Sequence, residues 1–170
     1  MSTSERVTPP MDADERTSLT SWLDFYRATL ADKCAGLAEE QLRTASAPPS
    51  PLTLVGLVRH LAEVERNWFR RVLAEEDVPD LFPEAAGAGG MSGGFGGAEE
   101  ASFEEAMELW RAEVEHARRA CATRSLDDTG ALGEARVTLR WICTHLIAEY
   151  ARHCGHADLI RERIDGRTGV

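Results

Sequence analysis

Glu149 and His153 are the residues of this sequence whose types and spacing suggest chemistry. They lie four residues apart in the stretch 138–164, so on a helix their side chains would differ in direction by only about 40°. Both fall where the helical period calls for an apolar residue, and an unpaired buried carboxylate costs roughly several kcal/mol. A divalent metal ion would satisfy both side chains at once. The apolar residues that set the period are Ile142, Leu146, Ala157, Ile160 and Ile164.

His60 is the candidate for a third ligand, from a second predicted helix over 50–76. It lies three residues after Leu57 and four before Val64, at the edge of an apolar stripe, so its ring is expected to point toward the core. Two facing helices can supply three ligands to one metal ion, and three protein ligands leave an open position, as in catalytic sites. The spacing therefore allows a metal site made by His60 with the acid and the imidazole of the later helix.

Other assignments of these residues stay open from spacing alone. His145 also lies four residues from Glu149 and could replace His153 as a ligand. His156, three residues past His153, is a further candidate. Alternatively, Glu149 and His153 form a buried hydrogen-bonded pair or a polar seam between two protomers, and His60 is a core histidine that binds no metal.

Four long amphipathic segments are predicted to be the helices that position these side chains. A capping box from Ser102 to Glu105 opens the third of them. No segment shows the alternation of a strand, so the predicted fold class is all-α, a four-helix bundle. The expected helices are 12 or 14 to 34, 50–76, 102–123 and 138–164, with a short helical piece at 38–43. The residues expected to point outward on the second helix are Arg59, Glu63, Arg66, Arg70 and Glu75.

A single domain is expected over 12–165, after a flexible lead at 1–11 and before a tail at 166–170. Its one long irregular region is a glycine-rich loop at 83–101. A loop of this length in a compact domain is usually functional or disordered, so we expect a mobile lid or a plain linker. Apolar residues in or next to this loop that could fold over a pocket are Phe82, Met91 and Phe95.

The net charge of −10 is spread along the chain. A surface this acidic repels phosphate backbones and anionic lipid, which argues against nucleic-acid and membrane-surface roles. The N-terminus lacks the apolar core of a signal peptide and no run approaches about 18 apolar residues, so a cytoplasmic protein is expected. The four cysteines include no CxxC pair and are expected to be reduced and mostly buried. Cys154 would point about 100° away from His153 on a helix, which disfavours cysteine catalysis.

Two segments resemble the DinB-like superfamily, and in particular its actinobacterial mini-circle-protein branch: LVRHLAEVERNWFRRVL at 57–73 and LIAEYARHCGHADLIRERIDG at 146–166. The resemblance implies a four-helix bundle in up-down-down-up order, often dimeric, with zinc or nickel between the second and fourth helices. Many members supply one histidine from the second helix and an HxxxH pair from the fourth. The matching positions here are His60, Glu149 and His153, as in the related mycothiol-dependent maleylpyruvate isomerases, so the resemblance favours His153 over His145.

The characterised relatives include transferases that use bacillithiol or mycothiol. The resemblance therefore implies a divalent-metal-dependent S-transferase, in which a low-molecular-weight thiol attacks an electrophilic small molecule. Glu63, Arg152 or His156 could orient the ligands or the substrate. One alternative is a non-catalytic stress or resistance protein that binds a metal or a small ligand. Another is a homodimeric bundle whose polar residues only specify the pairing.

Overall fold

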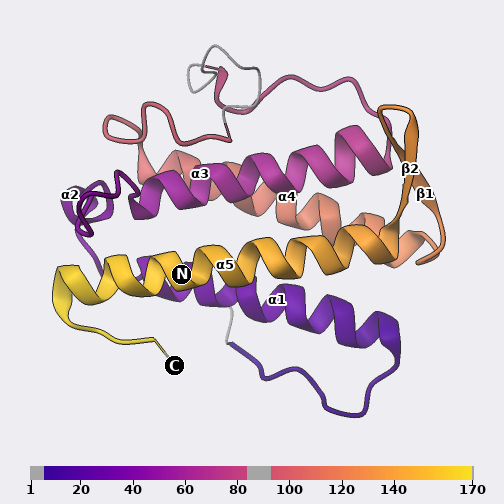
Figure 1. Cartoon of the computed structure of the whole chain (residues 1–170), viewed down its shortest axis with the longest axis horizontal. Helices are drawn as coiled ribbons and strands as arrows, with labels where there is room; N and C mark the ends of the chain where they lie inside the picture. The colour runs from indigo at the N-terminus through magenta and orange to yellow at the C-terminus, as the bar shows by residue number, and fades with distance from the viewer. Residues whose placement is uncertain (1–5, 84–92, 170) are drawn as a thin grey trace.

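The structure, a computed structural model, describes residues 6–83 and 93–169. This part of the chain is mostly helical, with five α-helices, one π-helix and a two-stranded sheet. The long helices lie side by side along the longest dimension of the molecule, with α2 at one end and the two strands at the other (Figure 1). In chain order the elements are α1 (Glu15–Cys34), α2 (Glu39–Leu42), α3 (Leu54–Glu65), η1 (Arg66–Leu73), α4 (Phe103–Thr123), β1 (Thr129–Leu132), β2 (Ala135–Thr138) and α5 (Leu139–Asp165).

Capping residues explain where the long helices begin. Asp14, Thr53, Ser102 and Thr138 each accept a hydrogen bond on the side chain from the backbone N–H three residues later, at 3.0 to 3.3 Å. Gly166, with φ 80°, ends α5 in the left-handed conformation that glycine adopts without strain. These ends agree with the predicted ranges of the first, third and fourth long helices.

The second long helix differs from the single α-helix predicted over 50–76. It begins as α3 after the Thr53 cap and continues from Arg66 to Leu73 as the π-helix η1. A π-helix forms i to i+5 hydrogen bonds, and such segments often occur at functional sites. Trp68 and Arg71, which line the cavity described below, both belong to η1.

The prediction that no strand forms was wrong. Residues 129–138 form an antiparallel hairpin in which Thr129 pairs with Thr138 and Leu132 with Ala135. Gly133 has φ 58° at the first position of a two-residue turn, as a type II′ hairpin turn requires. The hairpin packs against the end of η1: a Cβ atom added at Gly130 would lie 2.1 Å from the Val72 carbonyl oxygen. Contact with η1 thus holds a hairpin whose strands are too short to be stable alone.

The core lies where α1 packs along α5 and α3 packs along α4, with α3 also meeting α5. Because α3 contacts both α4 and α5, it is buried on most sides. The expected outward direction was therefore wrong for Arg59 and Glu63, whose exposed fractions are 1% and 7%. The same expectation holds for Glu75, which is exposed. Core residues from the four long segments include Leu23, Leu30, Leu57, Leu61, Trp110, Val114, Ile142, Leu146, Tyr150 and Ala157.

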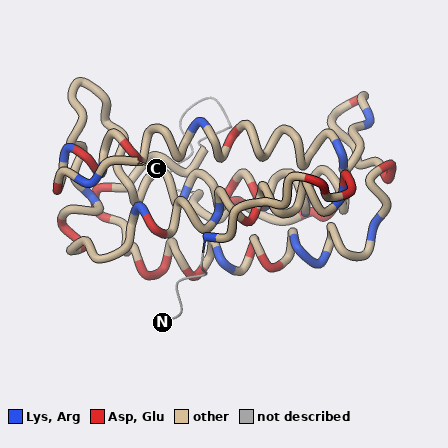
Figure 2. Tube along the Cα trace, turned by 90° about the horizontal axis from the view of Figure 1, so that it is seen from below, with Lys and Arg blue, Asp and Glu red and all other residues tan. Residues whose placement is uncertain are grey.

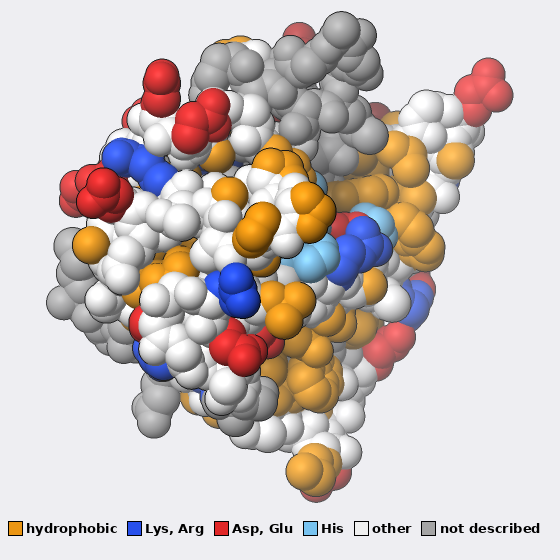
Figure 3. Space-filling model, turned by 60° about the vertical axis from the view of Figure 1, so that its left-hand side comes forward, with side chains coloured by type: hydrophobic (Ala, Val, Ile, Leu, Met, Phe, Trp, Pro, Cys, Tyr) orange, Lys and Arg blue, Asp and Glu red, His pale blue; other side chains and the backbone are white. Residues whose placement is uncertain are grey.

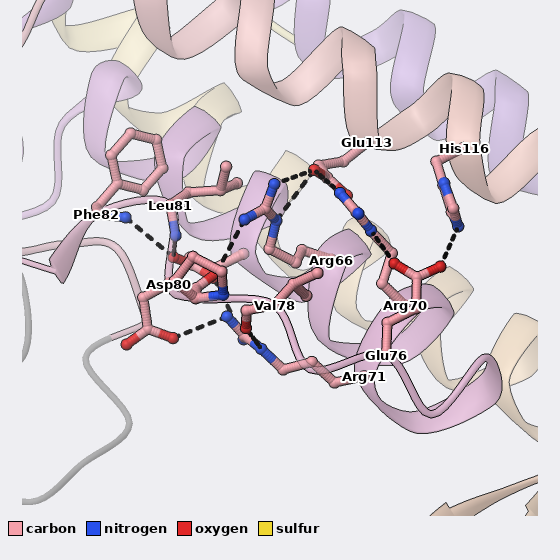
Figure 4. Close-up of polar contacts among 12 residues, drawn as sticks. Arg66, Arg70, Arg71, Glu76, Val78, Asp80, Leu81, Phe82, Glu113 and His116 are labelled. Atoms are coloured by element: carbon pink, nitrogen blue, oxygen red, sulfur yellow. Dashed lines mark hydrogen bonds and ion pairs between the residues drawn. The ribbon is translucent and has the colours of Figure 1, made fainter.

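Arginines of η1 tie its outer face to α4 (Figure 4). The side chains of Arg66 and Arg70 donate to Glu113 Oε1 at 2.8 and 3.4 Å. Arg70 also donates to Glu76 at 2.7 Å, and Glu76 lies 3.7 Å from His116 of α4. This network fixes one side of η1 to α4. The Trp68 ring of η1 instead contacts His145 of α5.

Acidic and basic residues are distributed along the length of the molecule and do not gather at one end (Figure 2). No helix in the described ranges is both long enough and apolar enough to cross a membrane.

Candidate metal centre

The structure brings His60 of α3 together with Glu149 and His153 of α5. One ligand atom from each of the three side chains lies within 4.8 Å of those from the other two. His153 Nε2 is 3.3 Å from Glu149 Oε2, and the rings of His60 and His153 meet edge to face with their centroids 4.5 Å apart. Ligand atoms around one tetrahedral zinc ion lie roughly 3.4 Å from one another. Shifts of about 1 Å or less would therefore bring these atoms to coordination distance.

The ring of His60 is oriented by the glycine-rich loop. A carbonyl oxygen only accepts hydrogen bonds, so His60 Nδ1 carries the proton that it shares with the Gly93 carbonyl oxygen at 2.7 Å. Nε2 is then the unprotonated nitrogen. It is buried and has no hydrogen-bond partner within the described residues. A buried acceptor left in this way, beside a carboxylate and a second imidazole, fits a metal ligand.

Glycine allows the loop to pass this close to α3. A Cβ atom added at Gly94, where φ is 77°, would lie 2.8 Å from the backbone carbon of Arg59. Phe95 follows, and its ring stacks on His60 at 4.4 Å with an interplanar angle of 16°. The described part of the loop thus covers the centre through Phe95. Of the other two apolar residues expected to fold over a pocket, Phe82 is buried under the Arg59 guanidinium and does not line the cavity described below, and Met91 lies outside the described residues. Sequence reasoning had not identified Gly93 or Phe95 as residues that contact His60, although glycines next to an aromatic residue were a visible signal.

Two neighbours flank the ligand candidates on α5. His156 Nδ1 lies 3.3 Å from His153 Nδ1, so a hydrogen bond between these atoms leaves His153 Nε2 facing Glu149. Arg152, which is exposed, pairs with the other carboxylate oxygen of Glu149 at 3.4 Å. Figure 3 shows histidine side chains at the surface beside a basic side chain, at the edge of a hydrophobic area. His156 therefore contacts His153, and Arg152 contacts Glu149, while an orienting role for either residue stays a prediction.

His145 and Glu63 have other contacts. The His145 ring stacks on Trp141 with centroids 4.9 Å apart, and His145 is not in the group of atoms that meet within 4.8 Å. Glu63 accepts backbone N–H groups of Leu81 and Phe82, so it fixes the segment after η1. Among the described residues, the assembled set is the one that contains His153.

Burial determines the protonation of both imidazoles. Burial, followed by the neighbouring His60, lowers the pKa of His153 to about 4. Burial likewise lowers the pKa of His60, against the raising effect of the hydrogen bond to Gly93. Both rings are therefore neutral at pH 7, which is the form that binds a metal ion.

The metal-free protein is expected to lose stability as the pH falls from about 6.5 to about 4. In the unfolded chain these histidines take up protons near pH 6.5, whereas His153 takes one up only near pH 4 in the fold, so the unfolded state binds more protons in this interval. Urea unfolding in the presence of a chelator, at half-unit steps of pH, measures the effect. His153→Gln, which removes one titrating group, should give a smaller slope, and an equal slope in the variant would contradict the assignment.

A cavity of about 810 Å³ adjoins the centre. His60, Glu149, Gly93 and Phe95 line it at the centre, and Trp68 belongs to its wall on η1. The sequence does not identify Trp68 as a residue that lines a cavity. The position of the cavity allows small molecules to reach the three ligand candidates.

The cysteines do not contribute to this centre. All four are buried and none forms a disulfide. Burial raises the pKa of the Cys34 and Cys154 thiols to about 12, so both are protonated and unreactive at neutral pH. Cys154 follows His153 in sequence, but its thiol faces the Tyr26 carbonyl oxygen of α1.

Comparison with known protein families gives one finding. The family whose model matches the chain is described as mycothiol-S-transferase, and the match covers residues 18–166. No curated protein matches the chain.

Proposed function

The chain belongs to the mycothiol-S-transferase family, and from this premise we propose that it is a metal-dependent enzyme that joins a mycothiol-like thiol to an electrophilic small molecule. The observation that carries the proposal is the meeting of His60, Glu149 and His153 within 4.8 Å beside a cavity. Two imidazoles and one carboxylate are a donor set that catalytic zinc sites use, with one position open for a further ligand.

The metal assignment is supported by the state of each ligand atom. His60 Nε2 is buried and without a hydrogen-bond partner among the described residues, and both imidazoles are neutral at pH 7. Outer partners fix the ring and carboxylate orientations: the Gly93 carbonyl for His60 and Arg152 for Glu149. We propose zinc or nickel as the ion, because nitrogen-rich sites favour these metals over magnesium or calcium.

The residues of the chain position the reactants and exclude water. When bound, a divalent ion supplies Lewis acidity, which lowers the pKa of a thiol in its open position. Phe95 covers His60 from the loop side, and the cavity has room for the electrophile next to the thiol. The sulfur then forms a bond to the electrophilic carbon, the leaving group departs with the bonding electrons, and the thiol proton passes to solvent. The loop that contains Phe95 would act as the lid over this step.

We also propose that the fold is the four-helix bundle in up-down-down-up order that the resemblance implies. Arg140 pairs with Glu15 at one end of α1 and α5, and Lys33 pairs with Asp158 at the other, which supports a parallel arrangement of these two helices. His60 faces His153, whereas Trp68, two turns later, faces His145, which supports an antiparallel arrangement of the α3–η1 segment and α5.

The decisive experiment combines metal removal with a conjugation assay. Protein purified without a histidine tag is expected to bind about one equivalent of zinc or nickel and to accelerate the reaction of mycothiol with monochlorobimane, in which a C–S bond replaces the C–Cl bond and chloride leaves. Chelation should lower the rate by about 100-fold or more, because the thiol loses the Lewis acid, and one equivalent of metal should restore it.

Each of the other outcomes would indicate a different function. Bound metal without any acceleration of conjugation would leave the non-catalytic metal-binding protein as the function. No bound metal, before or after incubation with zinc or nickel, would leave a structural role for the three polar residues.

A further inference from the structure

The cavity beside the metal centre extends to an aromatic wall. His60 and Glu149 line it near the centre, and Trp68 and His145 line it farther along the two facing helices. Trp68 follows His60 by eight residues, roughly 12 Å along the helix axis. A small molecule that contacts this wall is therefore distant enough to leave space for a thiol at the centre, yet lies in the same cavity.

Three rings hold the wall in a fixed arrangement. His145 stacks on Trp141, with centroids 4.9 Å apart and an interplanar angle of 9°. Trp68 meets His145 edge to face at 4.7 Å and lies 5.2 Å from Trp141. Each ring restricts the rotation of the others, so the surface that Trp68 and His145 present to the cavity is formed before a ligand binds. Such a surface suits a planar, apolar ligand.

The charges of the lining disfavour an anionic ligand. Among the described lining residues, Glu63, Asp80 and Glu149 are acidic and Arg71 is the basic one. Arg71 is already engaged, because it donates to the Val78 carbonyl oxygen at 3.0 Å and to Asp80 at 2.9 Å (Figure 4). It also lies 3.6 Å from Glu63. A carboxylate on the ligand would meet two acidic groups next to a guanidinium that they already neutralise.

We propose that the electrophile is an uncharged, planar aromatic molecule that lies against Trp68 and His145, with its reactive carbon directed toward the metal centre. The identification of this ligand as the electrophile rests on the proposed transferase function, whereas its binding to the wall does not. Trp68 and His145 are then specificity-determining residues that contact the substrate away from the reacting atoms.

The test measures binding to metal-free protein, so that it does not depend on catalysis. Titration calorimetry in the presence of a chelator compares 1-naphthalenemethanol with 1-naphthoate, which share a ring system and differ in charge. The neutral compound is expected to bind about 10-fold more tightly, because the carboxylate would meet Asp80 and Glu63. Trp68→Leu should weaken its binding about 5- to 10-fold, and Trp68→Phe, which keeps an aromatic ring, should restore most of the affinity.

Trp22→Ala is the matched control, because Trp22 is a partly exposed tryptophan on α1 that does not line the cavity. It should leave the affinity unchanged. Equal or tighter binding of the naphthoate, or unchanged binding in Trp68→Leu, would overturn the proposal. So would displacement of the naphthalene by the sugar portion of mycothiol without its cysteine, since the wall would then hold the thiol. If conjugation fails but the neutral naphthalene binds through Trp68, the transferase function fails and the aromatic site stands.

Discussion

Replacing His153 with alanine is expected to reduce bound metal from about one equivalent to below about 0.1, and to abolish metal-dependent conjugation. Loss of an outer hydrogen-bond partner of a metal ligand typically costs roughly 10- to 100-fold in affinity, and loss of the ligand itself costs more. The variant retains only His60 and Glu149, one imidazole and one carboxylate. Competition with a chromophoric chelator measures the affinity, and elemental analysis measures the stoichiometry. His60→Ala should give the same result.

His145→Ala is the matched control for this prediction. His145 lies the same number of residues from Glu149 as His153 does, but its ring stacks on Trp141 and is not part of the assembled group. The control should therefore retain its metal. If His145→Ala lost the metal and His153→Ala kept it, the ligand set would be the alternative that spacing alone left open.

The candidate ligands could be predicted from the sequence because the signal lies within a single helix. Glu149 and His153 interrupt an apolar period on one helix, and that periodicity survives in α5, where His153 is buried and Glu149 half-buried. The choice between His153 and His145 could not come from spacing, since both are one turn from Glu149. It depended on a resemblance, and the geometry agrees with it because α3 crosses α5 at a level where His60 faces His153.

Features that depend on distant contacts could not be predicted in this way. The hairpin at 129–138 has four-residue strands and is held by the end of η1, where Gly130 approaches the Val72 carbonyl. The apolar periodicity of this helix predicted that Arg59 and Glu63 are exposed. Periodicity within one helix does not show that α3 packs against two other helices, so that prediction was wrong. The change from α-helix to π-helix at Arg66 likewise has no signal in residue spacing. The starts of the first, third and fourth long helices were predictable because each is determined by a cap, Asp14, Ser102 or Thr138, that accepts from the backbone N–H three residues later.

A buried ion pair between α1 and α3 is another feature that the sequence could not predict. Arg27 donates through Nε and Nη2 to both carboxylate oxygens of Glu65, each at 2.8 Å. Tyr150 donates to Glu65 Oε1 at 2.7 Å, and Trp110 donates to the Tyr150 hydroxyl at 2.8 Å. The side chains of Arg27 and Glu65 are 5% and 0% exposed. The pair joins residues 38 positions apart, so neither sequence neighbourhood reveals it.

Replacing Arg27 with methionine is expected to destabilise the protein by about 3–5 kcal/mol, because it leaves the Glu65 carboxylate buried without its cation. Burial lowers the pKa of Arg27, yet the attraction of Glu65 more than offsets it and raises the pKa, so this guanidinium remains charged in the core. Urea unfolding at pH 7 measures the change in free energy of unfolding.

The double variant Arg27→Met/Glu65→Gln separates loss of packing from loss of charge balance. Glutamine keeps an oxygen that can accept from Tyr150 but carries no charge, so the double variant should recover a large part of the stability lost in Arg27→Met. Arg167→Met is the control: Arg167 and its partner Asp32 are 54% and 43% exposed, and exposed pairs contribute about 0–1 kcal/mol. If Arg27→Met cost no more than Arg167→Met, or if the double variant were as unstable as the sum of its two single changes, the pair would not carry the electrostatic role that its burial implies.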